Sequence, residues 1–264
     1  RPGGSLGTGM RPYLTHEHPI RFAHRGSRVL WPENTMPAFQ GAVDLGYRYL
    51  ETDVHVTRDD VVVVFHDDRL ERLTNGTGKV SEWRWEDLRA LDAAYHFNPD
   101  AGFPLRGSGV GIPTLEELAR TFPDALVNID LKQRGIAERV AVEVDRLGLT
   151  ERVMIGSFSG RRIARFRVAS GGAVATSAGP AEVAAAVAGR ASAGAADAFQ
   201  VPEGARGVRI VTQRFVERAH AAGKHVHVWT INDEEAMHRL LDLGVDGIVT
   251  DRPDILNDVV AARV

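Results

Sequence analysis

The sequence predicts an α/β fold, a (β/α)8 TIM barrel with a small insertion after a hairpin on the second strand. Three observations support this. Short apolar segments alternate with helical segments, eight such strands can be counted, and 264 residues suit one barrel of about 250 residues. Length alone also allows two domains of roughly 150 residues. The expected strands are 20–24, 47–54, 125–131, 152–158, 172–177, 198–202, 225–230 and 246–250.

Each expected strand leads into a helix or into a segment that ends in one. In the segment 32–46, Asn34 or Thr35 is the expected N-cap and Gly46 the stop signal. Strands and helices that alternate at these lengths predict parallel βα units. The remaining helices of the barrel are expected within 136–148, 160–170, 180–189, 212–223, 233–244 and 253–264.

One strand-like segment, 61–65, interrupts this alternation. Only six residues separate it from Val54, too few for a crossover helix, so we expect an antiparallel hairpin through a turn at 58–60. The Gly-, Pro- and aromatic-rich residues 68–112 then form an insertion, which is closed by a helix in 114–122.

The ends of the chain suggest its organisation and setting. Residues 1–19 are expected to be an N-terminal tail and 20–264 the barrel domain, which includes the insertion 68–112. Residues 1–9 lack an initiator Met and are expected to be added sequence or flexible tail, with Met10 a plausible native start. No apolar run approaches the roughly 18 residues that span a bilayer, and no signal peptide is recognisable. We expect a cytoplasmic protein without stable membrane insertion.

Composition narrows the chemistry. The formal net charge is −3, which gives no global field to hold a polyanion, so nucleic acid is not an expected partner. The chain has no cysteine, which excludes disulfides, thiolate nucleophiles and cysteine metal sites. Histidine, carboxylates, Lys and Arg must therefore supply the reactive groups.

His24 ends the first expected strand. It shares a face with Ile20 and Phe22 that points into the barrel, and it lies at the C-terminal end, where barrel active sites are built. A lone histidine there is more often a packed residue. The side chains expected around it favour a functional role.

Three carboxylates are expected near His24. Glu51 and Asp53 share one face of the second strand, and Asp130 and Lys132 share the polar face of the next barrel strand. Like charges this close raise one another's pKa or require a cation. An all-oxygen cluster suits Mg²⁺ or Ca²⁺ rather than soft metals. Capping by Arg or Lys is the structural alternative.

The hairpin register decides where a second histidine lies. If Arg58 pairs with Val61, His66 lies opposite Asp53 on the same face, whereas a slip of one residue turns His66 away. With Arg25, these residues supply a base, an acid, a charge clamp and a cation site, which are the parts of metal-assisted phosphodiester cleavage. A structural ion-pair network is the alternative, and we favour the enzyme.

A histidine pair lies on the seventh expected strand. His225, His227 and Trp229 share one face, and the two histidines are expected lower in the barrel as hydrogen-bonded core. Trp229, nearest the mouth, is placed to pack against the carbon skeleton of a ligand.

These residues fall within motifs that resemble the glycerophosphodiester phosphodiesterase family of the phosphatidylinositol-phosphodiesterase-like barrel superfamily, in its bacterial form. The motifs occur in family order over about residues 20–256, nearly the whole chain. They are FAHRG (22–26), PENT (32–35), ETDVHVTRDDVVVVFHD (51–67), LTNGTG (73–78), IPTLEE (112–117), NIDLK (128–132), GSF (156–158), VHVWTIN (226–232) and GVDGIVTDRP (244–253).

The resemblance implies a function. It implies hydrolysis of glycerophosphodiesters to sn-glycerol 3-phosphate and an alcohol, dependent on one divalent cation, Mg²⁺ or Ca²⁺, within lipid and glycerol metabolism. By motif position, His24 and His66 match the catalytic pair, and Arg25 and Lys132 the phosphate contacts. Trp229 matches an aromatic residue at the glycerol pocket, and the metal ligands match Glu51, Asp53 and Asp130.

Two positions depart from the family pattern. Asp130 stands where Glu is commoner, and Asp59-Asp60 replaces the usual Asp-Gly turn. The shorter side chain at 130 makes it the least secure of the three ligands. The altered turn leaves the hairpin register open.

The expected mechanism uses His24 as the base and His66 as the acid, with either the glycerol 2-hydroxyl or water as nucleophile. One alternative is a lysophospholipase D, which would need an apolar rim within 95–110, where Tyr95, Phe97 and Phe103 are available. We expect these three aromatics to form the core of the insertion instead. A non-catalytic barrel that binds phosphorylated ligands is the other alternative.

Overall fold

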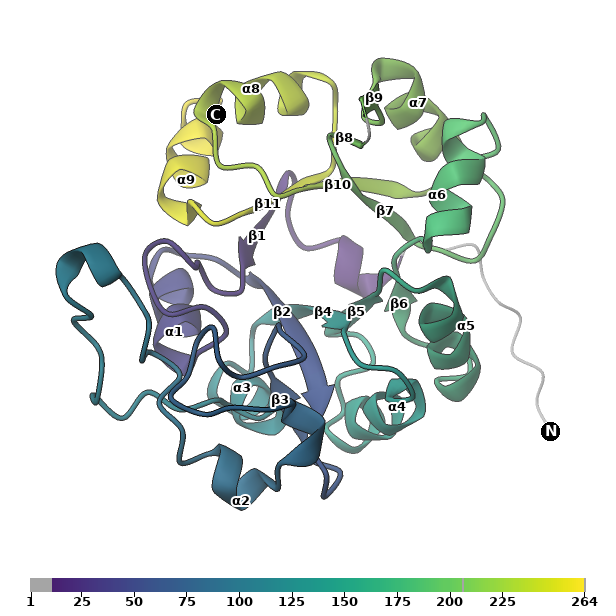
Figure 1. The fold of residues 1–264 in the computed structure, drawn as a ribbon. Coiled ribbons are helices and arrows are strands. Elements are labelled where there is room, and N and C mark those ends of the chain that lie inside the picture. The colour runs from purple at the N-terminus through teal and green to yellow at the C-terminus, as the bar shows by residue number, and fades with distance from the viewer. Residues whose placement is uncertain (1–10, 206, 264) are drawn as a thin grey trace.

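The computed structural model describes residues 11–205 and 207–263 and forms a parallel barrel surrounded by helices (Figure 1). Eight strands follow one another around it in the order β6-β5-β4-β2-β1-β11-β10-β7. An isolated parallel bridge between Ser177 and Ala198 joins the two ends of this order. The strands are β1 (Ile20–His24), β2 (Tyr49–Val56), β4 (Leu126–Leu131), β5 (Val153–Gly156), β6 (Ala175–Thr176), β7 (Ala198–Pro202), β10 (His225–Trp229) and β11 (Gly247–Thr250).

The helices cover the outside of the barrel and begin where the sequence supplies caps. The Thr35 hydroxyl accepts a hydrogen bond from the Ala38 amide, and Thr114 with Glu117 forms a capping box. The helices are α1 (Met36–Asp44), α3 (Leu115–Thr121), α4 (Ala137–Arg146), α5 (Gly160–Ala169), α6 (Pro180–Val187), α7 (Gln213–Ala221), α8 (Glu234–Asp242) and α9 (Pro253–Ala261). A short hairpin, β8 (Gly204–Ala205) and β9 (Val208–Arg209), precedes α7.

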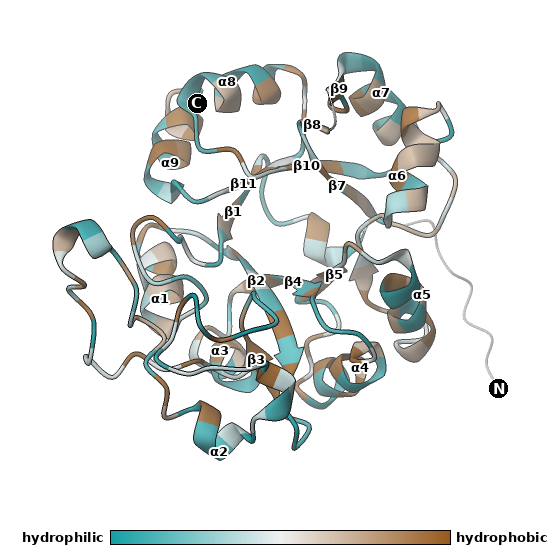
Figure 2. Ribbon diagram, viewed as in Figure 1, coloured by the Kyte–Doolittle hydropathy of each residue, from teal (hydrophilic) through white to brown (hydrophobic). Residues whose placement is uncertain are grey.

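Alternation along the strands separates two environments. Outward residues such as Leu50 and Ile129 pack under the helices, whereas inward residues such as Phe22 and Tyr49 fill the barrel. Figure 2 shows the hydrophilic residues of the helices mostly on their outer sides. The inward positions turn polar toward the C-terminal ends of β1, β2 and β4, and this change creates the site.

The hairpin of β2 with β3 (Val62–Val64) is present, but the expected register is wrong by one residue. Val54 pairs with Val64 and Val56 with Val62, so the connection is three residues, 58–60, rather than two. Asp60 takes the left-handed conformation, with φ of 63°, as the last residue of that loop. Such three-residue loops are a common hairpin type with a left-handed final position.

The insertion builds its own small core against the hairpin. It contains η2 (Val80–Glu82), α2 (Trp85–Leu88) and η3 (Pro99–Ala101). The cluster joins Val63 and Phe65 of the hairpin segment to the insertion residues Leu70, Val80, Leu88, Ala93 and Ile112.

The three aromatics expected to form that core lie elsewhere, so this expectation was wrong. The Arg106 guanidinium lies 4.2 Å from the ring centre of Tyr95 and 3.8 Å from that of Phe103. Phe97 lines a cavity beside the barrel. All three are partly exposed, and the Arg106 guanidinium lies against two of them, Tyr95 and Phe103.

The segment expected to be a tail is partly structured. Residues 1–10, with the predicted added sequence 1–9, lie outside the described residues. The next residues form η1 (Pro12–Leu14), in which Tyr13 and Leu14 are buried against Ile20, Phe22 and Tyr49 inside the barrel. These side chains fill its N-terminal end, so the barrel is a packed core with its open end at the other side.

Within the described part of the chain, none of the helices is both long and apolar enough to cross a membrane.

Removing the hydroxyl group from either of two buried tyrosines should change the free energy of unfolding differently. Tyr49 donates a 2.6 Å hydrogen bond to the Tyr13 carbonyl, whereas the Tyr13 hydroxyl is buried without a partner among the described residues. Tyr49→Phe should lower the free energy of unfolding by about 1 kcal/mol. Tyr13→Phe should leave it unchanged or raise it, measured by urea denaturation. A larger loss for Tyr13→Phe than for Tyr49→Phe would contradict this placement.

Candidate active site

His24 is held by a carboxylate at the C-terminal end of β1. Its Nδ1 lies 2.7 Å from Oδ1 of Asp251, which follows β11. Because a carboxylate only accepts, Nδ1 carries the proton and Nε2 faces the barrel mouth, 3.8 Å from Glu51. The Asp251 side chain is fully buried and also accepts from Asn232 Nδ2 at 3.0 Å and Arg28 Nε at 3.0 Å.

Charge determines the protonation behaviour of this pair. Burial lowers the pKa of His24, but Glu51 and Asp251 outweigh it, so that the pKa is raised above its ordinary value. Burial alone would raise the pKa of Asp251, whereas the hydrogen bond to His24 lowers it to about 2. Asp251 therefore stays ionised and increases the proton affinity of the imidazole.

Two carboxylates of β2 differ sharply in environment. Burial and the neighbouring Asp53 raise the pKa of Glu51 to about 7. Asp53 accepts from Asn34 Nδ2 at 2.9 Å and forms ion pairs with Arg25 Nε at 3.0 Å and Lys132 Nζ at 2.9 Å. These cations outweigh burial and hold the pKa of Asp53 below its ordinary value.

Asp130 lies beside Asp53 on β4, as the strand pairing requires. Its Oδ2 accepts from Lys132 Nζ at 2.6 Å, while its Oδ1 is buried without a partner among the described residues. Burial raises the pKa of Asp130. The ammonium of Lys132 therefore bridges two carboxylates and leaves one oxygen unsatisfied.

The carboxylates partly fit a hard cation. Three oxygen donors on adjacent strands are the ligand type that Mg²⁺ and Ca²⁺ prefer, and the unpartnered Asp130 Oδ1 supplies a free ligand atom. In the described residues, however, no three His, Asp or Glu side chains converge into a preformed metal-ligand group. Lys132 lies between two of the candidate ligands instead.

His66 follows β3 and reaches the site from the loop rather than from a strand pair. Its Nδ1 lies 2.5 Å from Asp67 Oδ1, and its carbonyl accepts from His55 Nε2 at 3.1 Å. Burial is the main cause that lowers the pKa of His66, and the charges of Asp53 and Arg25 also act on it. The histidine is thus near the cluster although the predicted register is wrong.

The loop after β1 is strained where it approaches the cluster. Arg25 has a φ of 53°, unusual for a residue other than glycine, and its backbone amide donates to Glu51 Oε2 at 3.1 Å. Gly26 follows with φ of 80°, and a Cβ there would come within 2.6 Å of the Ala38 backbone. The close packing of α1 thus requires glycine at 26 and directs Arg25 inward.

An aromatic pair forms another wall of the mouth. Trp229 ends β10 and packs edge-to-face on Phe158, with ring centres 5.4 Å apart. Phe158 is 64% exposed, and the Lys132 ammonium lies 5.3 Å from the centre of its ring. An exposed aromatic beside a cation is suited to hold a small ligand with both carbon and phosphate groups.

His225 and His227 lie inside the barrel, as expected, but their hydrogen bonding is poorer than expected. His227 Nδ1 is 3.4 Å from Gln200 Nε2, and neither His227 Nε2 nor His225 Nδ1 has a partner among the described residues. Burial holds the pKa of His227 well below its ordinary value. His227 is therefore neutral, and its ring centre lies 4.9 Å from that of Phe22.

Several site residues escaped the sequence analysis. Asp251 lies within the GVDGIVTDRP motif, and its position just after the last strand is the signal that places it at the mouth. Glu33 accepts from Arg25 at 2.8 Å, and Arg72 of the insertion donates to Asp67 and Glu33. Adjacency to His66 was the available signal for Asp67. Nothing local identified Arg72, because its partners come from distant segments.

A sequence profile described as "Glycerophosphoryl diester phosphodiesterase family" matches residues 24–255, a range that begins at His24 and includes Asp251. The chain belongs to this family. A Mycobacterium tuberculosis protein named "Probable glycerophosphodiester phosphodiesterase 2" is 40% identical over 261 residues, covering 95% of this chain and 94% of that protein. A glycerophosphodiester phosphodiesterase of Bacillus altitudinis is 32% identical over 247 residues, covering 88% and 94%.

Solved structures of this phosphodiesterase family share the fold. An Oleispira antarctica phosphodiesterase, solved in complex with the product sn-glycerol-3-phosphate, matches with a TM-score of 0.75 and 23% identity, covering 92% of this chain and 97% of that one. The likeness confirms the predicted TIM barrel. Family and relatives identify the protein as an enzyme, a glycerophosphodiester phosphodiesterase.

The His24–Asp251 contact predicts a measurable change in titration. Asp251→Asn keeps the size of the side chain but removes the charge that raises the pKa of His24, so that pKa should fall. Imidazole NMR titration measures it, with the buried His55 as an internal control that should not move. An unchanged pKa at His24 would contradict the pairing.

Proposed function

We propose that this phosphodiesterase hydrolyses glycerophosphodiesters to sn-glycerol 3-phosphate and an alcohol, using a divalent cation and two histidines. The observation that carries the proposal is the pair of carboxylate-held histidines, His24 with Asp251 and His66 with Asp67, around one buried carboxylate cluster. The product bound to the Oleispira antarctica relative supports the choice of sn-glycerol 3-phosphate.

His24 is proposed to take the proton of the nucleophile. Asp251 fixes the ring through Nδ1, which leaves Nε2 to accept, and the raised pKa gives this imidazole the higher proton affinity of the two. The nucleophile is either the glycerol 2-hydroxyl or water. The first gives a cyclic phosphate that water then opens.

His66 is proposed to protonate the leaving alcohol oxygen. Asp67 accepts from Nδ1 of His66. The pKa of His66 is lowered, so its imidazolium is the stronger acid of the two histidines. Arg72 fixes Asp67 in turn. General acid–base steps of this kind contribute about 10²–10⁴-fold each.

Arg25 and Lys132 are proposed to stabilise the charge that develops on the phosphate. Glu51, Asp53 and Asp130 would hold Mg²⁺ or Ca²⁺, with Lys132 moving from its bridging position toward the phosphate. The bound cation would supply Lewis-acid stabilisation of a phosphate oxygen. Trp229, with Phe158, would pack against the glycerol carbons.

The two histidine roles can be separated by the leaving group. His24→Ala and His66→Ala should each lower kcat on an alkyl glycerophosphodiester by about 10²–10⁴-fold. On the p-nitrophenyl ester, whose leaving group needs no proton, His66→Ala should recover most of its activity and His24→Ala should not. His238→Ala, at a partly exposed histidine on α8, is the control. If His24→Ala alone recovered activity on the p-nitrophenyl ester, His24 would be the acid and His66 the base.

If the carboxylates bind a cation, chelation should remove the activity and added metal should restore it. EDTA should abolish product release, and added Mg²⁺ or Ca²⁺ should restore it. The same ions should raise the melting temperature of the EDTA-treated protein, because a ligand that binds only the folded state stabilises it. Asp130→Asn should reduce this thermal shift, and Asp124→Asn, on the loop before β4, should not. Full activity in EDTA would contradict the proposal.

A further inference from the structure

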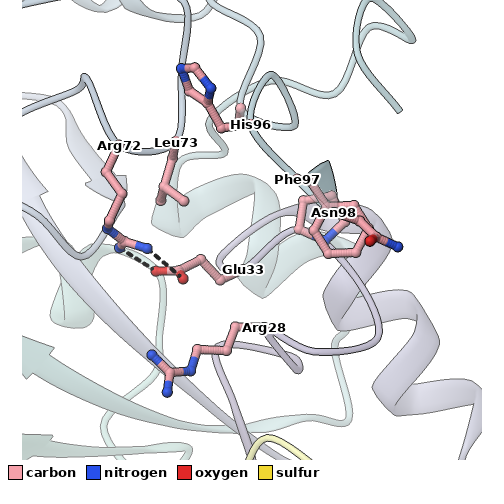
Figure 3. Close-up of a pocket in the computed structure, with 9 residues that line it drawn as sticks. Arg28, Glu33, Arg72, Leu73, His96, Phe97 and Asn98 are labelled. Carbon is pink, nitrogen blue, oxygen red and sulfur yellow. Dashed lines mark hydrogen bonds and ion pairs between the residues drawn. The ribbon is translucent and has the colours of Figure 1, made fainter. Parts of the chain in front are cut away.

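A cavity of about 240 Å³ lies between the loop after β1 and the insertion. In Figure 3, Arg28, Glu33 and Arg72 lie along one side, with Phe97 and Asn98 across from them and His96 above. The rest of its lining is apolar. The aromatic pair proposed to hold glycerol lies outside this lining.

The cavity adjoins both catalytic histidines through one intervening carboxylate each. Arg28 Nε donates to Asp251, which holds His24, at 3.0 Å. Arg72 Nε donates to Asp67, which holds His66, at 2.5 Å. A group bound here therefore lies on the insertion side of the reacting phosphate, next to the proposed acid.

The polar lining combines guanidinium groups with the carboxylates that pair with them. Among the described residues Glu33 is the only carboxylate of the lining itself, and it accepts from Arg25 at 2.8 Å and from Arg72 at 2.8 and 3.0 Å. These arginines outweigh burial and lower the pKa of Glu33, so its charge is present but compensated. Arg28 and Arg72 are about half exposed. Among the described residues Arg28 donates through Nε alone, so its Nη groups are available to a ligand, whereas Arg72 already donates through Nε, Nη1 and Nη2 to Asp67 and Glu33.

The volume of the cavity and the side chains that line it indicate a class of ligand. The volume is below the roughly 300–1,000 Å³ of drug-sized pockets, so it suits a head group rather than an acyl chain. Arginine donors suit hydroxyl oxygens. A quaternary ammonium is bound by several aromatic faces, whereas the described lining has one phenyl ring, Phe97.

We propose that this cavity binds the leaving alcohol of the diester and selects polyhydroxy alcohols, such as inositol or glycerol, over choline and ethanolamine. The inference rests on the proposed function, because it needs a diester at the mouth. It assigns the choice of substrate to the insertion and the choice of chemistry to the barrel.

Substrate preference tests the cavity. We expect kcat/KM for glycerophosphoinositol to exceed that for glycerophosphocholine by about tenfold, measured as release of sn-glycerol 3-phosphate. His96→Glu adds a carboxylate to the wall without replacing a residue proposed to act in catalysis. It should shift the ratio toward choline by about three- to tenfold. Asn98→Asp, a nearly isosteric change, should shift it in the same direction.

The matched control is Ser108→Glu, which adds the same charge at an exposed position of the insertion outside the lining. It should leave the ratio unchanged. A wild-type preference for choline, or the same ratio in wild type and both wall variants, would overturn the cavity assignment. If wild type released no sn-glycerol 3-phosphate from either diester, the proposed function itself would be wrong.

Discussion

The burial of the Asp53 carboxylate is the constraint on which the rest of the mouth depends. Its side chain is 2% exposed, and an isolated charge there would cost several kcal/mol. Arg25 from the loop after β1 and Lys132 from the end of β4 compensate it, and Asn34 donates to the same carboxylate. One buried charge thus draws three segments together and fixes the strained backbone at Arg25.

The two histidines are held by the same kind of contact but from different parts of the fold. Asp251, which holds His24, comes from the last barrel strand, whereas Asp67 is fixed by Arg72 of the insertion. Arg72 also donates to Glu33, which accepts from Arg25, so ion pairs connect the insertion to the loop after β1.

The strands and their inward faces are predictable because the period of side chains along a strand is fixed. All eight strands lie where alternating or continuous apolar residues placed them, and His24, Glu51 and Asp130 point inward because residues two apart share a face. The predicted hairpin register was wrong because Asp60 takes a left-handed conformation and lengthens the loop from two residues to three. The loop sequence alone does not distinguish these two lengths. The prediction that Tyr95 and Phe103 lie in the core of the insertion was wrong because both rings pack against Arg106 outside that core.

The sequence by itself determined the barrel, the inward faces and the reactive residue types, because these follow from local periodicity and from the absence of cysteine. The tertiary structure decided which carboxylate holds which histidine, and that Lys132 bridges Asp53 and Asp130. It also placed Arg28 and Arg72 around one cavity. These contacts join residues from distant segments, and only closure of the barrel and docking of the insertion bring them within bonding distance.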